Sequence, residues 1–173
     1  MVYVLLADGF EELEALAPYD ILVRGDVEVR FVSVNGTDFV TGTHGVTVRA
    51  DMRLDEIRLP AEMTVLPGGM PGMTNLNAVP GLDALLDGSD WLAAICASPS
   101  VLGLHGKLNG KKATCFPGFE KNLKGAQVSE ERVVRDGNVI TAKGAGVACE
   151  FGFALLAALR GEEIAARVRA SMQ

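Results

Sequence analysis

Residues 93–104, AAICASPSVLGL, constrain the fold of this chain more than any other stretch. The apolar run at 91–95 has the composition of a buried strand, and it stops at Cys96. Pro99, three residues later, is typical of the first turn of a helix. We therefore expect the Cys96 thiol on a sharp strand-to-helix turn, where free N–H groups and the helix dipole favour a thiolate or an oxyanion.

The remaining sequence alternates between strand-like and helix-like segments. Short apolar or alternating runs predict strands at 2–7, 27–34, 63–66 and 112–115, a hairpin outside the main sheet within 38–50, and a second hairpin from 132–135 and 139–141. Helical spacing predicts helices that begin near residue 11, cover 82–87, run from 144 to about 160 and cover 162–169. This order predicts an α/β sandwich with a mostly parallel sheet between helices, in one domain over residues 1–173.

Glycines follow two of the predicted strands at positions where a ligand site is expected. Gly9 follows the first strand, Gly68 and Gly69 follow the strand at 63–66, and Cys96 ends the strand at 91–95. Ligand sites in parallel α/β sheets lie at the carboxyl ends of strands. A double glycine also lets the backbone approach a ligand closely. The sequence therefore predicts a site at this edge of the sheet.

The net charge and the short apolar runs of the chain limit the classes of partner that we expect. The formal net charge is -6, and no cluster of Lys and Arg occurs, so nucleic acid and anionic membrane surfaces are not expected as partners. Apolar runs of about six residues are far shorter than the roughly 20 needed to cross a bilayer. The chain begins with a strand pattern and no basic leader, from which we expect a cytoplasmic protein.

The three cysteines are too widely spaced for a disulfide framework. Cys96, Cys115 and Cys149 contain no CxxC pair and are odd in number, so at least one thiol stays free. We expect Cys115 and Cys149 to act as small buried apolar residues. The two histidines, His44 and His105, are not spaced as a ligand pair, so neither a metal nor another cofactor is expected.

The first predicted helix carries an unusual group of carboxylates. Its expected buried face contains Leu13, Leu16, Ala17 and Ile21. Its first turn, where the helix dipole favours negative charge, contains Glu11, Glu12 and Glu14, of which two are expected to face water. Pro18 has no N–H to donate to the carbonyl of Glu14, so we expect a kink that directs the Glu14 side chain away from solvent.

Four motifs together resemble a known family. ADGFEELEAL, VLPGGMPG, AAICASPSVLG and TAKGAGVACEFGFALL occur in this order and span nearly the whole chain. They are similar to motifs of the ThiJ/PfpI superfamily, in its DJ-one-like and YajL-like branch. The resemblance implies a flavodoxin-like fold with a nucleophile elbow and a homodimer.

The resemblance also implies roles for single residues. It makes Cys96 the reactive nucleophile and Glu14 the carboxylic acid that hydrogen-bonds to it. The backbone N–H groups of Gly69 and Ala97 take the position of the family's oxyanion hole, and Gly68 gives the turn room.

Other positions match the family less closely. Arg24 and His44 match positions near the dimer interface of relatives and are expected to support the site, although His44 stands where an arginine is common. Ser98 replaces the usual Gly or Ala beside the nucleophile. Phe116 stands where several relatives carry a histidine, so a Cys-His mechanism has no obvious base here.

Two classes of function follow for such a site. A charged Glu14 would raise the pKa of the thiol, so the expected arrangement is a protonated Glu14 that donates to an anionic sulfur. This arrangement supports a glyoxalase or deglycase that acts on small 2-oxoaldehydes, or on their adducts with thiols, amines or proteins. The alternative is a non-catalytic redox sensor or chaperone that works by oxidation of Cys96 to the sulfinate. A cysteine peptidase or amidotransferase-like hydrolase is less favoured.

Overall fold

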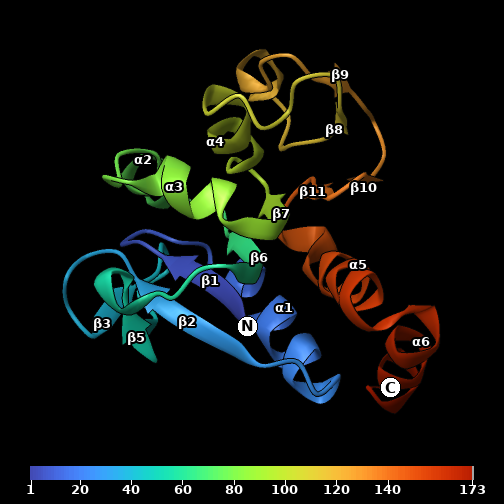
Figure 1. The fold of residues 1–173 in the computed structure, drawn as a ribbon, viewed down its shortest axis with the longest axis horizontal. Helices are drawn as coiled ribbons and strands as arrows, with labels where there is room; N and C mark the ends of the chain where they lie inside the picture. Colours follow the sequence, from blue (N-terminus) through green and yellow to red (C-terminus); the bar gives the residue numbers. More distant parts are fainter. Residues whose placement is uncertain (173) are drawn as a thin grey trace.

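The computed structural model describes residues 1–172 and consists of a central sheet between two layers of helices (Figure 1). Seven strands form the sheet in the order β10-β11-β7-β6-β1-β2-β5, and every neighbouring pair is parallel except β10 with β11. The α/β class and the mostly parallel sheet are confirmed. The strands of this sheet are β1 (Val2–Leu6), β2 (Val29–Ser33), β5 (Met52–Arg53), β6 (Ala61–Leu66), β7 (Ser89–Ile95), β10 (Val133–Asp136) and β11 (Val139–Ala142).

The helices cover both faces of this sheet (Figure 1). One face carries α1 (Glu12–Arg24), α5 (Ala148–Arg160) and α6 (Glu162–Ser171), and the other carries α2 (Gly72–Asn77), α3 (Leu82–Asp87) and α4 (Pro99–Leu104). The 3-10 turns are η1 (Leu54–Glu56), η2 (Glu120–Asn122) and η3 (Ala145–Val147). None of the helices within residues 1–172 is long and apolar enough to cross a membrane.

The central strand β1 shows why its apolar run is continuous. Val2, Val4 and Leu6 pack into the core beneath α1 and α5, whereas Tyr3 and Leu5 pack into the core beneath α3 and α4. Successive side chains of a strand point to opposite faces, so a strand covered on both sides must be apolar at every position.

Two small sheets lie outside the main one. The predicted hairpin is present as β3 (Phe39–Thr41) and β4 (Thr47–Arg49), which pair antiparallel. The strand predicted at 112–115 is only β8 (Lys112–Ala113), and it pairs with β9 (Gln127–Val128) away from the main sheet. The helix α3 has the predicted bounds, whereas β5, β9 and α2 were not predicted because their segments are too short to show a period.

The buried face of α1 differs from the prediction. Ile21 is buried as predicted, but Leu13 and Leu16 are 58% and 36% exposed. The buried stripe instead combines Ile21 with Ala15, Pro18 and Leu22. Both stripes have helical spacing, so the sequence pattern could not tell which one meets the sheet. The outward stripe leaves an apolar strip on the surface of the described chain.

The expected effect of Pro18 is also corrected. The helix α1 continues through Pro18 without interruption. The first-turn carboxylates do not face water either, because Glu12 and Glu14 are buried and Glu11 is partly buried. Glu14 is buried because loops after β6 and β7 cover the first turn of α1, so no break in the helix is needed to explain its position.

The last long helix begins later than predicted. We expected it from residue 144, but α5 starts at Ala148 and is preceded by the single 3-10 turn η3. Gly161 ends α5 as expected, and α6 follows at once.

Candidate active site at the Cys96 elbow

Cys96 lies between the end of β7 and the start of α4, on the predicted turn. Its φ angle is 65°, a left-handed value that side chains other than glycine rarely adopt. The turn is held on both sides: the Cys96 N–H donates to the Ala142 carbonyl at 2.9 Å, and the Cys96 carbonyl accepts from the Phe116 N–H at 2.8 Å. A strained residue of this kind persists only where its surroundings fix it, which makes the elbow a candidate for function.

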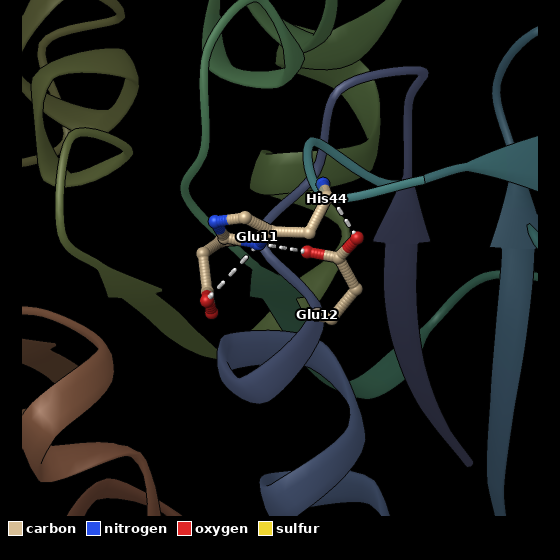
Figure 2. Close-up of side chains that lie close together, drawn as sticks. All are labelled: Glu11, Glu12 and His44. Carbon is tan, nitrogen blue, oxygen red and sulfur yellow. Dashed lines mark hydrogen bonds and ion pairs between the residues drawn. The ribbon is translucent and has the colours of Figure 1, made fainter. Parts of the chain in front are cut away.

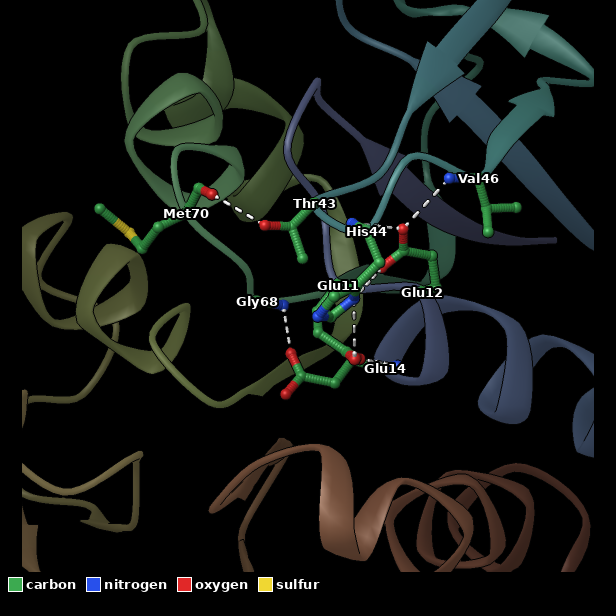
Figure 3. A network of polar contacts seen from close by, with 8 residues as sticks. All are labelled: Glu11, Glu12, Glu14, Thr43, His44, Val46, Gly68 and Met70. Atoms are coloured by element: carbon green, nitrogen blue, oxygen red, sulfur yellow. Dashed lines mark hydrogen bonds and ion pairs between the residues drawn. The ribbon is translucent and has the colours of Figure 1, made fainter.

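The Glu14 carboxyl group extends from the first turn of α1 to the N–H of Gly68 in the loop after β6 (Figure 3). Its Oε2 accepts a hydrogen bond of 2.9 Å from the Gly68 N–H. A Cβ atom on Gly68 would lie 2.4 Å from Glu14 Oε2 and 2.6 Å from Cys96 Cβ, so only a glycine fits between them. Glu14 Oε1 is buried and has no hydrogen bond of good geometry within residues 1–172.

The environment raises the pKa of both members of this pair. Burial raises the pKa of Glu14 to about 7, and the negative charge of Glu11 adds to the rise. Burial also raises the pKa of the Cys96 thiol to about 12, with a further contribution from the charge of Glu14. Because each negative charge disfavours the other, the pair does not hold two charges near neutral pH.

The expected effect of Glu14 on the thiol is present. The pKa of Glu14 is raised, and its negative charge raises the pKa of the Cys96 thiol, as expected. Beside a charged Glu14, the thiol is therefore favoured over the thiolate. A thiolate becomes favourable only when Glu14 takes up a proton, since the repulsion then disappears. The charge state of each group therefore depends on the proton held by the other.

Backbone amides of two neighbouring loops favour the charged form of the Cys96 sulfur. The amides of Ala97 and Gly69 both act to lower the pKa of the thiol. Gly69 has a φ of 94°, and a Cβ atom there would lie 2.4 Å from the Gly9 carbonyl oxygen. The loops after β1 and β6 thus pack backbone against backbone, and this close approach brings the Gly69 amide to the elbow.

Ser98 fixes the elbow to the loop after β6, which contains Gly68 and Gly69 and is called the glycine loop below. It is fully buried, and its hydroxyl donates to the Pro67 carbonyl at 2.6 Å. A glycine or alanine at this position could not make that bond. Serine at this position, in place of the usual glycine or alanine, therefore adds a hydrogen bond between the loops after β6 and β7.

Arg24 lies apart from the other predicted site residues. It sits in the last turn of α1 and pairs with Asp20 at 2.7 Å. Glu14 is in the first turn of the same helix, and ten residues of helix span roughly 15 Å. The structure therefore does not bring Arg24 to the elbow.

His44 is held by Glu12 beside the first turn of α1 (Figure 2). The Glu12 Oε2 and His44 Nδ1 atoms lie 2.7 Å apart, and Glu12 Oε1 accepts from the His44 amide at 2.7 Å. Burial acts to raise the pKa of Glu12, but the imidazole and the amides of His44 and Val46 hold it below the ordinary value. Glu12 thereby fixes the turn of the β3–β4 hairpin to the start of α1.

Glu11, Glu12 and His44 are also the residues that could hold a metal ion. One ligand atom from each lies within 4.8 Å of the others. Within this group Glu12 pairs with His44, and outside it Glu11 Oε2 accepts from the Glu14 N–H at 2.8 Å. The spacing of the two histidines in the sequence gave no sign of this group, since it forms only when the hairpin folds over α1.

The other two cysteines differ from each other. Cys115 is buried, as expected. Cys149 is exposed, so its prediction as a buried residue was wrong. It occupies the second position of α5 and lines a shallow surface pocket of about 140 Å³ together with Leu13 and Ala17.

Sequence reasoning missed two contributors to the site. The amide of Ala145 acts to lower the pKa of Glu14. Gly144 lies against both Glu14 and Phe116, where a Cβ atom would be 3.8 Å from Glu14 Oε1 and 3.2 Å from the Phe116 ring. In the sequence, only the glycines at 144 and 146 could have indicated that this segment borders the site. We interpreted them as the start of a helix.

The fold and the site define an α/β protein with a cysteine on a strand-to-helix elbow and a buried carboxyl group beside it. The chain belongs to the DJ-1/PfpI family, whose family model matches residues 1–158. It is 34% identical over 178 residues to the Parkinson disease protein 7 homolog of Danio rerio, covering 98% of this chain and 94% of the relative. The family resemblance of the sequence motifs is thus confirmed.

Two further relatives carry names that state an activity. The chain is 31% identical over 167 residues to a glutathione-independent glyoxalase of Caenorhabditis elegans, covering 92% of this chain and 88% of the relative. It is 34% identical over 149 residues to a deglycase of Pyrococcus abyssi, covering 82% and 89%. Among solved structures, oxidized DJ-1 of Toxoplasma gondii matches with a TM-score of 0.91 at 34% identity, covering 99% of this chain and 96% of the other.

Proposed function

We propose that this protein converts reactive 2-oxoaldehydes, or their adducts with thiols and amines, through Cys96 and Glu14. One observation carries the proposal: Glu14 is a fully buried carboxyl group whose pKa, about 7, suits a general base at neutral pH, and it lies beside the thiol. Relatives named as a glyoxalase and a deglycase support this class of substrate.

The proposed reaction begins with addition of the Cys96 sulfur to the aldehyde carbon. A sulfur–carbon bond forms, the thiol proton moves to Glu14, and the carbonyl oxygen becomes an oxyanion. The N–H groups of Gly69 and Ala97, which favour the charged form of the sulfur, stabilise that oxyanion until it is protonated. Because the thiol proton leaves as the bond forms, the high pKa of resting Cys96 does not prevent the attack.

The remaining steps are an internal redox reaction and a hydrolysis. Glu14 first returns the thiol proton to the oxyanion, which leaves a hydroxyl group on the adduct carbon. Glu14 then moves a proton from the adduct carbon to the neighbouring carbonyl carbon, and the hydroxyl proton passes to the neighbouring oxygen, so the first carbon is oxidised to a thioester and the second is reduced to an alcohol. Water then cleaves the thioester, which releases a 2-hydroxy acid and returns the thiol. No external oxidant or reductant is needed.

Methylglyoxal consumption by the wild type and two variants tests this proposal. Cys96→Ser should abolish turnover, and Glu14→Gln should reduce it by about a hundredfold or more, as expected for loss of a general base. Cys149→Ser is the matched control, since it removes an exposed thiol outside the site and should leave turnover unchanged. Unchanged turnover in Cys96→Ser would contradict the proposal.

A redox sensor or chaperone without catalytic function is the second candidate. The half-buried Cys96 thiol, with the Gly69 and Ala97 amides favouring its charged form and a protonated Glu14 beside it, could hold a sulfinate through hydrogen bonds. The raised pKa of Cys96 argues against it, because peroxide oxidises the thiolate faster than the thiol.

Mild peroxide separates this candidate from the enzyme. A sensor should gain two oxygens on Cys96 before Cys115 or Cys149 is modified, as measured by peptide mass. Cys149 makes the comparison stringent because it is the exposed thiol. Oxidation of Cys149 ahead of Cys96 would exclude a sensor at the elbow.

A Cys-His hydrolase is the least supported class. His44 is paired with Glu12, and the His105 Nδ1 atom lies 2.8 Å from an Asp83 carboxylate oxygen. Neither imidazole is among the main groups that shift the pKa of the Cys96 thiol.

A further inference from the structure

Phe116 borders the elbow from a loop that no strand or helix contains. Its N–H donates to the Cys96 carbonyl at 2.8 Å, which fixes its backbone beside the nucleophile. From the position of a Cβ atom on Gly144, the ring Cδ2 lies at 3.2 Å and Glu14 Oε1 at 3.8 Å. The aromatic ring and the carboxyl group therefore border the same space above Gly144.

The Phe116 side chain keeps an exposed surface. The residue is 47% exposed, so part of its ring remains open to contact with another molecule. A phenyl ring can neither accept nor donate a proton in the reaction. What it offers is an apolar face against which another apolar or aromatic group can pack.

We propose that Phe116 is a specificity-determining residue that makes this site select 2-oxoaldehydes carrying an aromatic or bulky apolar substituent. The inference rests on the proposed function and names the substrate class within it. When the aldehyde carbon is bonded to the Cys96 sulfur, the substituent on the neighbouring carbonyl carbon packs against the Phe116 ring. Burial of that substituent and of the exposed ring face favours the larger substrate.

The ratio of kcat/KM for phenylglyoxal to that for methylglyoxal tests this inference. Phe116→Ala should lower the ratio about tenfold, the change expected for loss of one aromatic contact. Phe116→Leu keeps an apolar wall and should lower it less. Phe39→Ala is the matched control, because Phe39 is a more exposed phenylalanine on β3 and should leave the ratio unchanged.

Alkylation of Cys96 gives a second measurement that needs no turnover. The sulfur displaces iodide from N-phenyl iodoacetamide or from iodoacetamide, and peptide mass reports the rate at Cys96 for each reagent. The wild type should favour the phenyl reagent, and Phe116→Ala should lose this preference while Phe39→Ala keeps it.

The two measurements separate failure of the inference from failure of the proposed function. The protein could turn over both aldehydes while Phe116→Ala changes neither the kcat/KM ratio nor the ratio of alkylation rates. That result would overturn the role of Phe116 and leave the proposed function standing. Absence of turnover together with a Phe116-dependent alkylation preference would overturn the proposed reaction and support aromatic recognition at the elbow.

Discussion

At the scale of single residues, the Glu14 carboxyl group is placed at a cost to stability. The protein buries this group completely, and burial raises its pKa from 4.5 to about 7. A carboxyl group exposed to solvent would stay ionised without this cost in free energy. A buried carboxyl that titrates near neutral pH is useful to proton transfer and unfavourable to folding. The same residue therefore connects the proposed reaction to the pH dependence of stability.

Glu14→Gln should stabilise the protein at alkaline pH. The folded state of the wild type binds the Glu14 proton more tightly than the unfolded chain does. This contribution to stability is fully present below about pH 4.5 and is lost as the pH rises through about 7. The loss amounts to about 3 kcal/mol, and glutamine cannot lose a proton.

Urea unfolding at pH 5 and pH 8 measures this effect. The free energy of unfolding of Glu14→Gln should exceed that of the wild type by a larger amount at pH 8 than at pH 5. An equal difference at both pH values would show that Glu14 does not titrate in this range.

At the scale of elements, the carboxylates at the start of α1 connect this helix to the β3–β4 hairpin and to the loop after β6. Glu11 accepts from the Glu14 N–H, Glu12 holds the β3–β4 hairpin, and Glu14 reaches the loop after β6 (Figure 3). The hairpin has a second attachment near the glycine loop, because the Thr43 hydroxyl donates to the Met70 carbonyl at 3.2 Å. The helix thus aligns the loops that form the site.

Glu12→Ala should release the hairpin turn without unfolding the sheet. The His44 and Val46 amides lose their acceptor, so their hydrogen exchange should become faster and the protein should lose about 1 to 2 kcal/mol of stability. Glu150→Ala is a suitable control, since it breaks an exposed ion pair with Arg132 and should have a much smaller effect. Amide exchange followed by mass spectrometry tests this, and unchanged protection of residues 42–46 would contradict it.

At the scale of the whole molecule, the outward stripe of α1 is an apolar surface without a partner in this chain. Leu13, Leu16 and Val23 are exposed there, and Cys149 at the start of α5 lies beside Leu13. Grouped exposed apolar residues are typical of an interface. The family resemblance implies a homodimer, and we propose that this stripe contributes to it.

Leu13→Asp should weaken that dimer. Placing a charge in an apolar interface costs several kcal/mol when the charge has no partner, so the variant should sediment as a monomer at concentrations where the wild type is a dimer. Leu104→Asp, at a 50% exposed leucine on α4, should leave the sedimentation unchanged. A wild type that sediments as a monomer, or a Leu13→Asp variant that remains a dimer, would exclude this interface.

The sequence by itself determined the local features of this protein. Short-range periodicity and the positions of glycine and proline control these features, so residue order alone predicts them. They are the continuous apolar runs, the bounds of α3, the hairpin at 38–50 and the turn that ends β7 at Cys96. The order of strands and helices was likewise sufficient for the α/β class.

Only the tertiary structure decided what those elements touch. Two stripes of α1 had helical spacing, and packing against the sheet buried Ala15 and Ile21 and left Leu13 outside. From the sequence we expected a kink at Pro18 to direct the Glu14 side chain away from solvent. In the structure the helix is uninterrupted, and the loops after β6 and β7 bury that side chain. Burial, and with it the pKa of Glu14, depends on residues more than 50 positions away, and no local pattern contains that information.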